Sequence, residues 1–163
     1  MSVIVNNTAL SNLASVNSLE LLKGVFERVY LTPEVYGEVE NGVHLGRRYL
    51  ECIKLTVGVQ DWLLMTDLER GEIELYNSLK KKVDIGEASC LAIAIVRKWL
   101  FITDDRRARR IAERNNIKLS GTLGVLKLAV SQNLISKYEG NILLRTMIQN
   151  GYYSPVSELD DIF

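Results

Sequence analysis

The sequence alternates between short apolar runs and longer segments in which apolar residues recur with a helical period. Val3–Val5, Val29–Leu31 and Leu100–Ile102 have the composition expected of strands covered on both faces. A helical pattern follows each of them, most clearly at Thr32-Pro33, where a threonine cap precedes a proline at the first helical position. This alternation predicts an α/β fold, in which a parallel β-sheet is sandwiched between helices.

Length and composition limit the remaining possibilities. With 163 residues the chain fits one domain, which we assign to residues 1–151, followed by a polar and acidic C-terminal tail, 152–163. The formal net charge is zero, so only a local patch can attract a polyanion. The two cysteines form no metal-binding motif, and no apolar run suits a membrane span or a secretion signal. We expect a soluble protein of the cytoplasm that does not bind membranes.

Acidic and amide side chains lie where the predicted strands end or the next helices begin. Asn7 follows the first strand, Asp104 and Asp105 follow the run that ends at Ile102, and Glu38 and Glu87 lie near helix starts. Ligands bind at the carboxyl edge of an open parallel sheet. Several carboxylates in one cavity repel one another, and a divalent cation offsets this repulsion. Oxygen ligands without cysteine or histidine favour Mg²⁺ or Mn²⁺.

Helix capping is an alternative interpretation of several of these residues. Asp84 and Glu87 have the spacing of a capping box, with aspartate in place of serine or threonine. Asp104 or Asp105 can cap the helix that follows them, although one cap needs only one acid. Thr8 can likewise be the N-cap of the first helix.

Five motifs in the same order resemble the PIN-domain family, specifically the group related to the toxin ribonucleases of bacterial and archaeal toxin-antitoxin pairs (VapC-related). The motifs are V-I-V-N-N-T-A-L-S-N-L-A, Y-G-E-V, G-E-A, F-I-T-D-D-R-R-A-R-R-I-A and S-G-T-L-G-V-L. The resemblance implies a parallel sheet between helices and an endoribonuclease that depends on Mg²⁺ or Mn²⁺.

The resemblance also implies roles for individual residues. Glu38, Glu87 and Asp105 match the second, third and fourth acids of the family, and Asp104 either assists in metal binding or only caps a helix. Thr8 resembles a hydroxyl residue that helps to hold metal or water, and Thr103 is a second supporting residue. The family usually has an aspartate where this chain has Asn7.

Asn7 leaves three interpretations open, because an amide oxygen can ligate a cation but brings no charge and cannot act as a base. The site can work with fewer carboxylates, or the protein can bind protein or RNA without cutting, or the site can have been altered to silence it. A phospho-receiver-like domain is a separate hypothesis for the whole chain. It is weaker, because asparagines stand where the first acids of such a domain are expected.

Basic residues follow the last pair of acids. Arg106, Arg107 and Arg110 share one side of a predicted helix and are candidates to hold RNA phosphates, although a solvated helix face is an equally good interpretation. Lys80–Lys82 is better interpreted as a solvated helix end.

Two protein partners are also expected, a cognate antitoxin and a second copy of the chain in a homodimer. An apolar stripe could form the dimer contact or simply belong to the core; its residues are Leu10, Leu13, Leu21 and Leu22.

Overall fold

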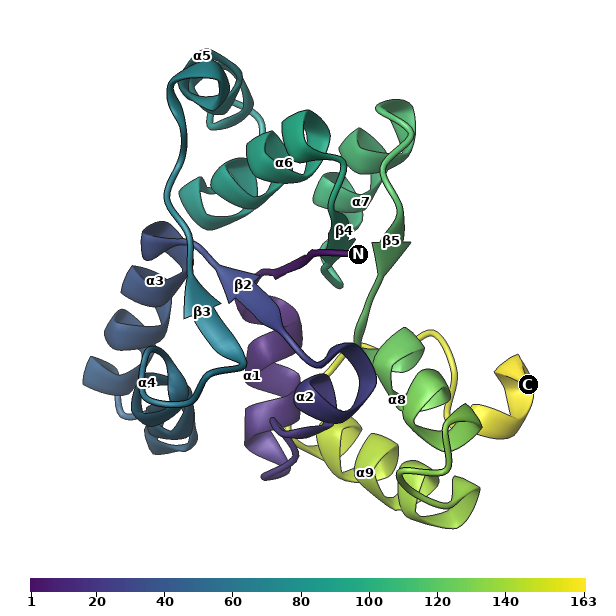
Figure 1. The fold of residues 1–163 in the computed structure, drawn as a ribbon. Helices are drawn as coiled ribbons and strands as arrows, with labels where there is room; N and C mark the ends of the chain where they lie inside the picture. Colours follow the sequence, from purple (N-terminus) through teal and green to yellow (C-terminus); the bar gives the residue numbers. More distant parts are fainter.

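A computed structural model describes residues 1–163. Its five strands form one parallel sheet in the order β3-β2-β1-β4-β5 (Figure 1). The strands are β1 (Val3–Val5), β2 (Val29–Leu31), β3 (Leu63–Met65), β4 (Leu100–Ile102) and β5 (Leu119–Ser120). The three strands predicted from consecutive apolar residues are confirmed, together with the α/β fold class.

Nine helices and two short 3-10 helices connect the strands. They are α1 (Asn7–Ser15), α2 (Leu21–Phe26), α3 (Pro33–His44), η1 (Arg48–Leu50), α4 (Glu51–Thr56), α5 (Arg70–Leu79), α6 (Ile85–Arg97), α7 (Arg106–Arg114), α8 (Thr122–Ser131), α9 (Lys137–Gln149) and η2 (Leu159–Ile162). None of the helices combines the length and the apolar composition that a bilayer crossing requires.

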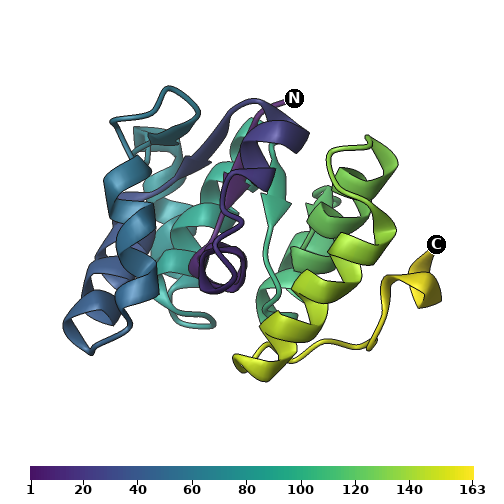
Figure 2. The same ribbon diagram turned by 90° about the horizontal axis from the view of Figure 1, so that it is seen from below.

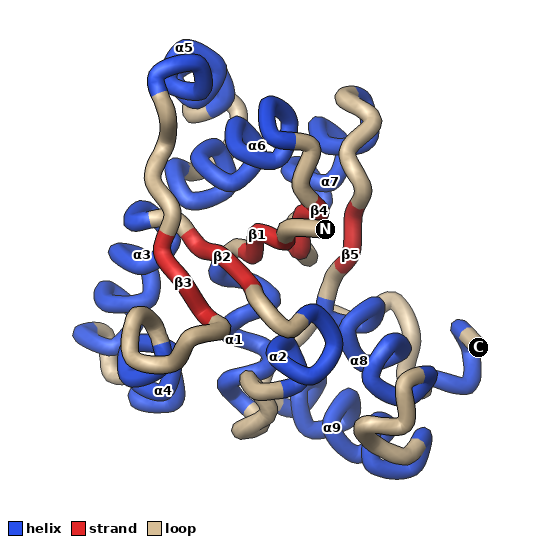
Figure 3. The backbone as a smooth tube through the Cα atoms, in the orientation of Figure 1, coloured by secondary structure: helices blue, strands red, loops and turns tan.

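Helices cover both faces of the sheet. The α6 and α7 helices lie over one face, with α5 packed against α6, while α1, α2, α8 and α9 lie on the opposite side (Figures 1 and 2). The strands form a narrow band between these helices (Figure 3). Because both faces are covered, all three residues of β1 are buried.

The order of the strands places the functional candidates together. The β1 strand is central and pairs with β2 on one side and with β4 on the other. Since the strands are parallel, the residues that follow β1, β2, β4 and β5 all lie at one edge of the sheet. The α6 helix runs back across the sheet before β4, so its N-terminal turn lies at this same edge.

The apolar stripe of the first two helices is mainly core. Leu10, Leu13 and Leu22 are fully buried within the hydrophobic cluster, and Leu21 is partly buried against it. Of the two interpretations given to this stripe, the structure supports packing within the chain. These three leucines therefore offer no surface to a second copy.

The C-terminal tail packs against the domain. Leu159 is fully buried, and its backbone N–H donates to Asn141 Oδ1 at 2.7 Å. Arg145 on α9 pairs with Glu158 at 2.6 Å. The η2 helix thereby contacts both α8 and α9. These contacts fix the segment that begins at Gly151, where a positive φ of 107° ends α9 with a turn suited to glycine.

Candidate active site

Two acids from different helices meet near the start of α6. The backbone N–H of Gly86 donates to Oε1 of Glu38 at 3.0 Å, which brings the second turn of α3 against the first turn of α6. Asp84 caps α6, as predicted, by accepting a 2.9 Å bond from the Glu87 N–H. Glu38, Asp84 and Glu87 thus lie within one small region at the carboxyl edge of the sheet.

The negative charges in this region favour the binding of protons or cations. Burial, and then the nearby Asp84 carboxylate, raise the pKa of Glu38 to about 7. Burial raises the pKa of Glu87 to about 8, with further contributions from the negative charges of Asp84, Asp105 and Glu38. We refer to Glu38, Asp84, Glu87 and Asp105 as the acid cluster.

Asp105 is held at the end of β4 by a network around Thr103. The buried Thr103 hydroxyl accepts a 3.1 Å bond from the Asp105 N–H and a 2.7 Å bond from Asn6 Nδ2. Asp105 also caps α7, because its Oδ1 accepts from the Ala108 N–H at 2.8 Å. Its carboxylate therefore has a capping role while it contributes negative charge to the acid cluster. Thr103 supports the site by positioning this backbone.

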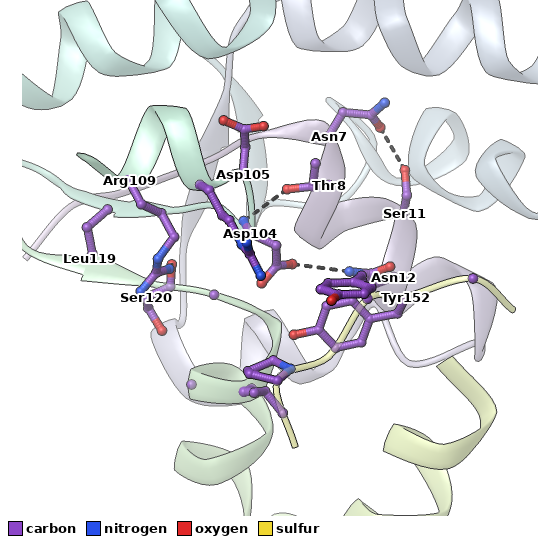
Figure 4. A pocket seen from close by; sticks show the side chains of 17 residues that line it. Asn7, Thr8, Ser11, Asn12, Asp104, Asp105, Arg109, Leu119, Ser120 and Tyr152 are labelled. Atoms are coloured by element: carbon purple, nitrogen blue, oxygen red, sulfur yellow. Dashed lines mark hydrogen bonds between the residues drawn. The ribbon is translucent and has the colours of Figure 1, made fainter. Parts of the chain in front are cut away.

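Asp104 points away from the acid cluster. Its carboxylate accepts bonds from the Thr122 backbone N–H at 2.9 Å, from the Thr122 hydroxyl and from Asn12 Nδ2 at 3.1 Å. Figure 4 shows the Asp104 carboxylate directed toward Asn12 and that of Asp105 directed elsewhere. Asp104 joins α1 to α8, while Asp105 faces α6. Gly121 occupies the N-cap position of α8, and the Thr122 hydroxyl binds Asp104.

Asn7 and Thr8 begin α1 beside this network. Asn7 Oδ1 accepts a 2.9 Å bond from the Ser11 hydroxyl. The Thr8 hydroxyl donates to Asn6 Oδ1 at 2.7 Å and accepts from the Asp104 N–H at 3.1 Å. The interpretation of Thr8 as the N-cap is corrected, because Asn6 caps α1 through the Thr8 N–H. Thr8 instead ties α1 to the end of β4.

Basic residues surround one side of the acid cluster. An open cleft of about 560 Å³, here called the basic cleft, is lined by Lys81, Lys82, Val83, Asp84, Glu87, Asp105, Arg106, Arg107 and Arg110. Arg107 Nη1 donates to the Lys82 carbonyl at 3.0 Å, which joins α7 to the α5–α6 connection. The three predicted arginines therefore lie beside Glu87 and Asp105. Sequence reasoning missed Lys81 and Lys82, because only the folded chain brings them next to α7.

A second and larger cavity lies on the other side of Asp105. It has a volume of about 910 Å³ and is here called the tail cavity, because the C-terminal tail forms one of its walls (Figure 4). Asp105 and Arg106 line both hollows. Arg109 faces this side, where its Nη1 donates to the carbonyl oxygens of Thr103 and Ser120. Of the acid cluster, Asp105 alone thus borders both the basic cleft and the tail cavity.

The structure groups only some of the predicted metal ligands. Glu38, Glu87 and Asp105 share the acid cluster, which also contains Asp84. Asp104 is engaged by α1 and α8, and Asn7 lines the tail cavity. No three acidic, histidine or cysteine side chains are positioned to hold one ion together.

Comparisons with known proteins agree with this fold. Residues 2–163 match the family model DUF3368, described as a PIN domain. The structure is similar to the crystal structure of PAE2754 from Pyrobaculum aerophilum, with a TM-score of 0.53 and 15% sequence identity over 80% of this chain and 96% of that one. A search of curated protein sequences finds no match. PIN domains are generally nucleases, and they usually depend on a divalent metal. Because the family model spans nearly the whole chain, this protein belongs to the PIN-domain family.

Proposed function

We propose that the protein is an endoribonuclease dependent on Mg²⁺ or Mn²⁺, with the acid cluster as its active site. The observation that carries the proposal is the convergence of Glu38, Glu87 and Asp105 near the start of α6, where burial and neighbouring negative charge raise the pKa of Glu38 to about 7 and that of Glu87 to about 8. Carboxylates that share a partly buried site bind protons when no cation is present. Side chains that perturb one another in this way at a sheet edge are candidates for a functional site.

The donor set fits a hard divalent cation. Glu38, Glu87 and Asp105 would supply the ligands, all of which are oxygens. The three carboxylates are not grouped closely enough as they stand to hold one ion together, so binding would require them to move closer. Asn7 stands in the position of the family's first acid, and its amide oxygen would be an uncharged ligand. Asp104 has its carboxylate occupied by Thr122 and Asn12, which favours a structural role for it.

Each group of residues has a separate part in the proposed reaction. The bound ion would supply an activated water and neutralise charge on the phosphodiester. Arg106, Arg107 and Arg110 would hold the phosphates of the strand, together with Lys81 and Lys82 of the basic cleft. Thr8 and Thr103 would keep the ends of β1 and β4 in register with the acids, through the bonds described above.

A catalytically inactive binding protein is the second candidate, and Asn7 is the observation that favours it. An active site that lacks one carboxylate binds a divalent cation more weakly. The basic cleft would remain in such a protein, since none of its basic residues depends on Asn7. RNA binding without cleavage is therefore the outcome that would distinguish it.

A toxin role, a cognate antitoxin and a homodimer are finer proposals that rest on the resemblance. Size-exclusion chromatography with light scattering at micromolar concentration tests the homodimer. A mass of a single chain, 18.4 kDa, would exclude it.

Titration of Mn²⁺ by calorimetry, combined with cleavage of a labelled RNA, tests the main proposal. Glu87→Gln removes a charge from the acid cluster and should weaken Mn²⁺ binding and abolish cleavage. The matched control is Asp161→Asn, which removes an equal charge from the exposed face of η2. Identical Mn²⁺ binding by the wild type and Glu87→Gln would overturn the proposed site.

A further inference from the structure

The tail cavity has a composition different from that of the basic cleft. Four of its 17 lining residues are hydrophobic, and two acids, Asp104 and Asp105, are matched by two arginines, Arg106 and Arg109. The others include the uncharged hydrogen-bonding side chains of Asn7, Thr8, Ser11, Asn12 and Ser120. Its volume of about 910 Å³ lies within the range of pockets that bury a small organic ligand. These features suit a flat group with several hydrogen-bonding atoms better than they suit a bare phosphate.

Two consecutive tyrosines from the tail stand in the wall of this cavity. Tyr152 is half-buried, and its backbone N–H donates to the Met147 carbonyl at 2.9 Å. Tyr153 is 83% exposed, and the guanidinium carbon of Arg106 lies 5.6 Å from the centre of its ring. Because the tail is anchored by Leu159 and by the Arg145–Glu158 pair, the tyrosines are held at the cavity without being covered.

Arg106 connects this aromatic wall to the acid cluster. The same side chain lines the basic cleft and lies against Tyr153. A single strand that places its phosphates in the basic cleft would therefore bring its next nucleotides over Asp105 and into the tail cavity. An aromatic ring beside a guanidinium is a stacking platform that accepts any base.

We propose that the tail cavity is a nucleobase subsite, in which an unpaired base of RNA stacks on Tyr153 and is bordered by Tyr152 and Asn12. This inference rests on the proposed function and names its substrate class as single-stranded RNA. A duplex would not enter, because its bases are already stacked and paired and present no free face. The phosphates on the other side of Asp105 lie in the basic cleft.

The test is a fluorescence-anisotropy titration of a labelled, unstructured ten-nucleotide RNA in EDTA, where cleavage and metal binding are suppressed. Tyr153→Ala should weaken binding about tenfold, as expected for the loss of one stacked base. Tyr153→Phe should bind like the wild type, since it keeps the ring. The control Tyr138→Ala removes another exposed tyrosine, from α9, that does not line the cavity, and it should have no effect.

Binding of a duplex RNA of the same length distinguishes base stacking on Tyr153 from electrostatic attraction to the phosphates. The effect of Tyr153→Ala should disappear on the duplex, because the Arg and Lys contacts to phosphate remain. Equal binding of the single strand by wild type and Tyr153→Ala would overturn the subsite, and so would an equal loss on single strand and duplex. Either result leaves the nuclease proposal standing. Conversely, a stacking effect in a protein that binds no Mn²⁺ and cuts no RNA would refute the nuclease and keep the subsite.

Discussion

The Gly86 backbone N–H lies 3.0 Å from Glu38 Oε1, and no side chain separates the two residues. A Cβ atom at position 86 would overlap the Glu38 carboxylate, with the carboxyl carbon only 2.8 Å away. The glycine therefore provides space for a close approach between α3 and α6. The position of Glu38 in the acid cluster depends on this space.

Gly86→Ala should displace the Glu38 carboxylate and weaken Mn²⁺ binding. Loss of an orienting contact to a metal ligand typically costs about 10- to 100-fold in affinity. Calorimetric titration measures the change. Gly71→Ala on α5 is the matched control, because a Cβ there meets nothing within 4 Å. Unchanged Mn²⁺ affinity in Gly86→Ala would remove Glu38 from the site.

Stability without metal should fall as the pH rises from about 4.5 to about 8. Glu38 and Glu87 have pKa values raised above the ordinary 4.5, so the folded chain holds more protons than the unfolded chain in this window. The free energy of unfolding should decrease by several kcal/mol across it, since the two pKa values are raised by about 2.5 and about 3.5 and one pKa unit is worth about 1.4 kcal/mol. Urea denaturation in EDTA at several pH values measures this slope. Glu87→Gln should flatten the slope, and parallel curves for both proteins would contradict the assignment.

Asn7→Asp should strengthen the site. The new carboxylate adds a negative charge to the cavity that Asp105 also lines, and the Ser11 hydroxyl can still donate to it, so the start of α1 should be retained. We expect Mn²⁺ to bind about tenfold more tightly, since one further charged ligand is worth at least 1.4 kcal/mol. RNA cleavage should rise in parallel. Asn77→Asp on the exposed side of α5 adds the same charge elsewhere and should change neither quantity.

If Asn7→Asp binds Mn²⁺ more tightly but cuts no RNA, the nuclease proposal fails and the binding protein is favoured. Cleavage by the wild type at a rate equal to that of Asn7→Asp would instead show that the site works with fewer carboxylates.

Mutation of Asp104 should mainly lower stability, and mutation of Asp105 should mainly weaken Mn²⁺ binding. Asp104→Ala removes the acceptor of three hydrogen bonds from Thr122 and Asn12, and should lower the free energy of unfolding by about 2–4 kcal/mol. Its Mn²⁺ affinity should change little. Asp105→Ala removes one helix cap, which costs about 1 kcal/mol, and should greatly weaken Mn²⁺ binding. A loss of Mn²⁺ binding in Asp104→Ala with unchanged stability would assign the metal role to Asp104.

Local sequence patterns predicted several of the strands and helix starts that position the site. The apolar runs and the Thr32-Pro33 signal located strands and helix starts, and Asp84 was correctly identified as a cap. Because parallel strands end at one edge, Asp105 and the α6 acid Glu87 could be expected near each other. These features depend on residues close in the sequence, or on the fold class alone.

Long-range packing decided what the sequence left open. Asp104 and Asp105 are adjacent in the chain, yet Thr122 at the start of α8 donates hydrogen bonds to Asp104 and directs its carboxylate away from the acid cluster. No pattern in the sequence around Asp104 predicts these donors. Lys82 meets Arg107 only because α7 packs beside the α5–α6 connection. The sequence of the C-terminal tail does not predict whether the tail packs against the domain. In the structure it does, through the hydrogen bond between Leu159 and Asn141.

The central position of β1 has a consequence for the newly made protein. One of its two partners, β2, follows closely in the chain, but the other, β4, lies almost a hundred residues later, so β1 emerges from the ribosome long before its second neighbour exists. The carboxylates at positions 38, 87 and 105 can meet only when about two-thirds of the polypeptide has been synthesised. The proposed metal site is therefore absent from the nascent chain until translation is well advanced.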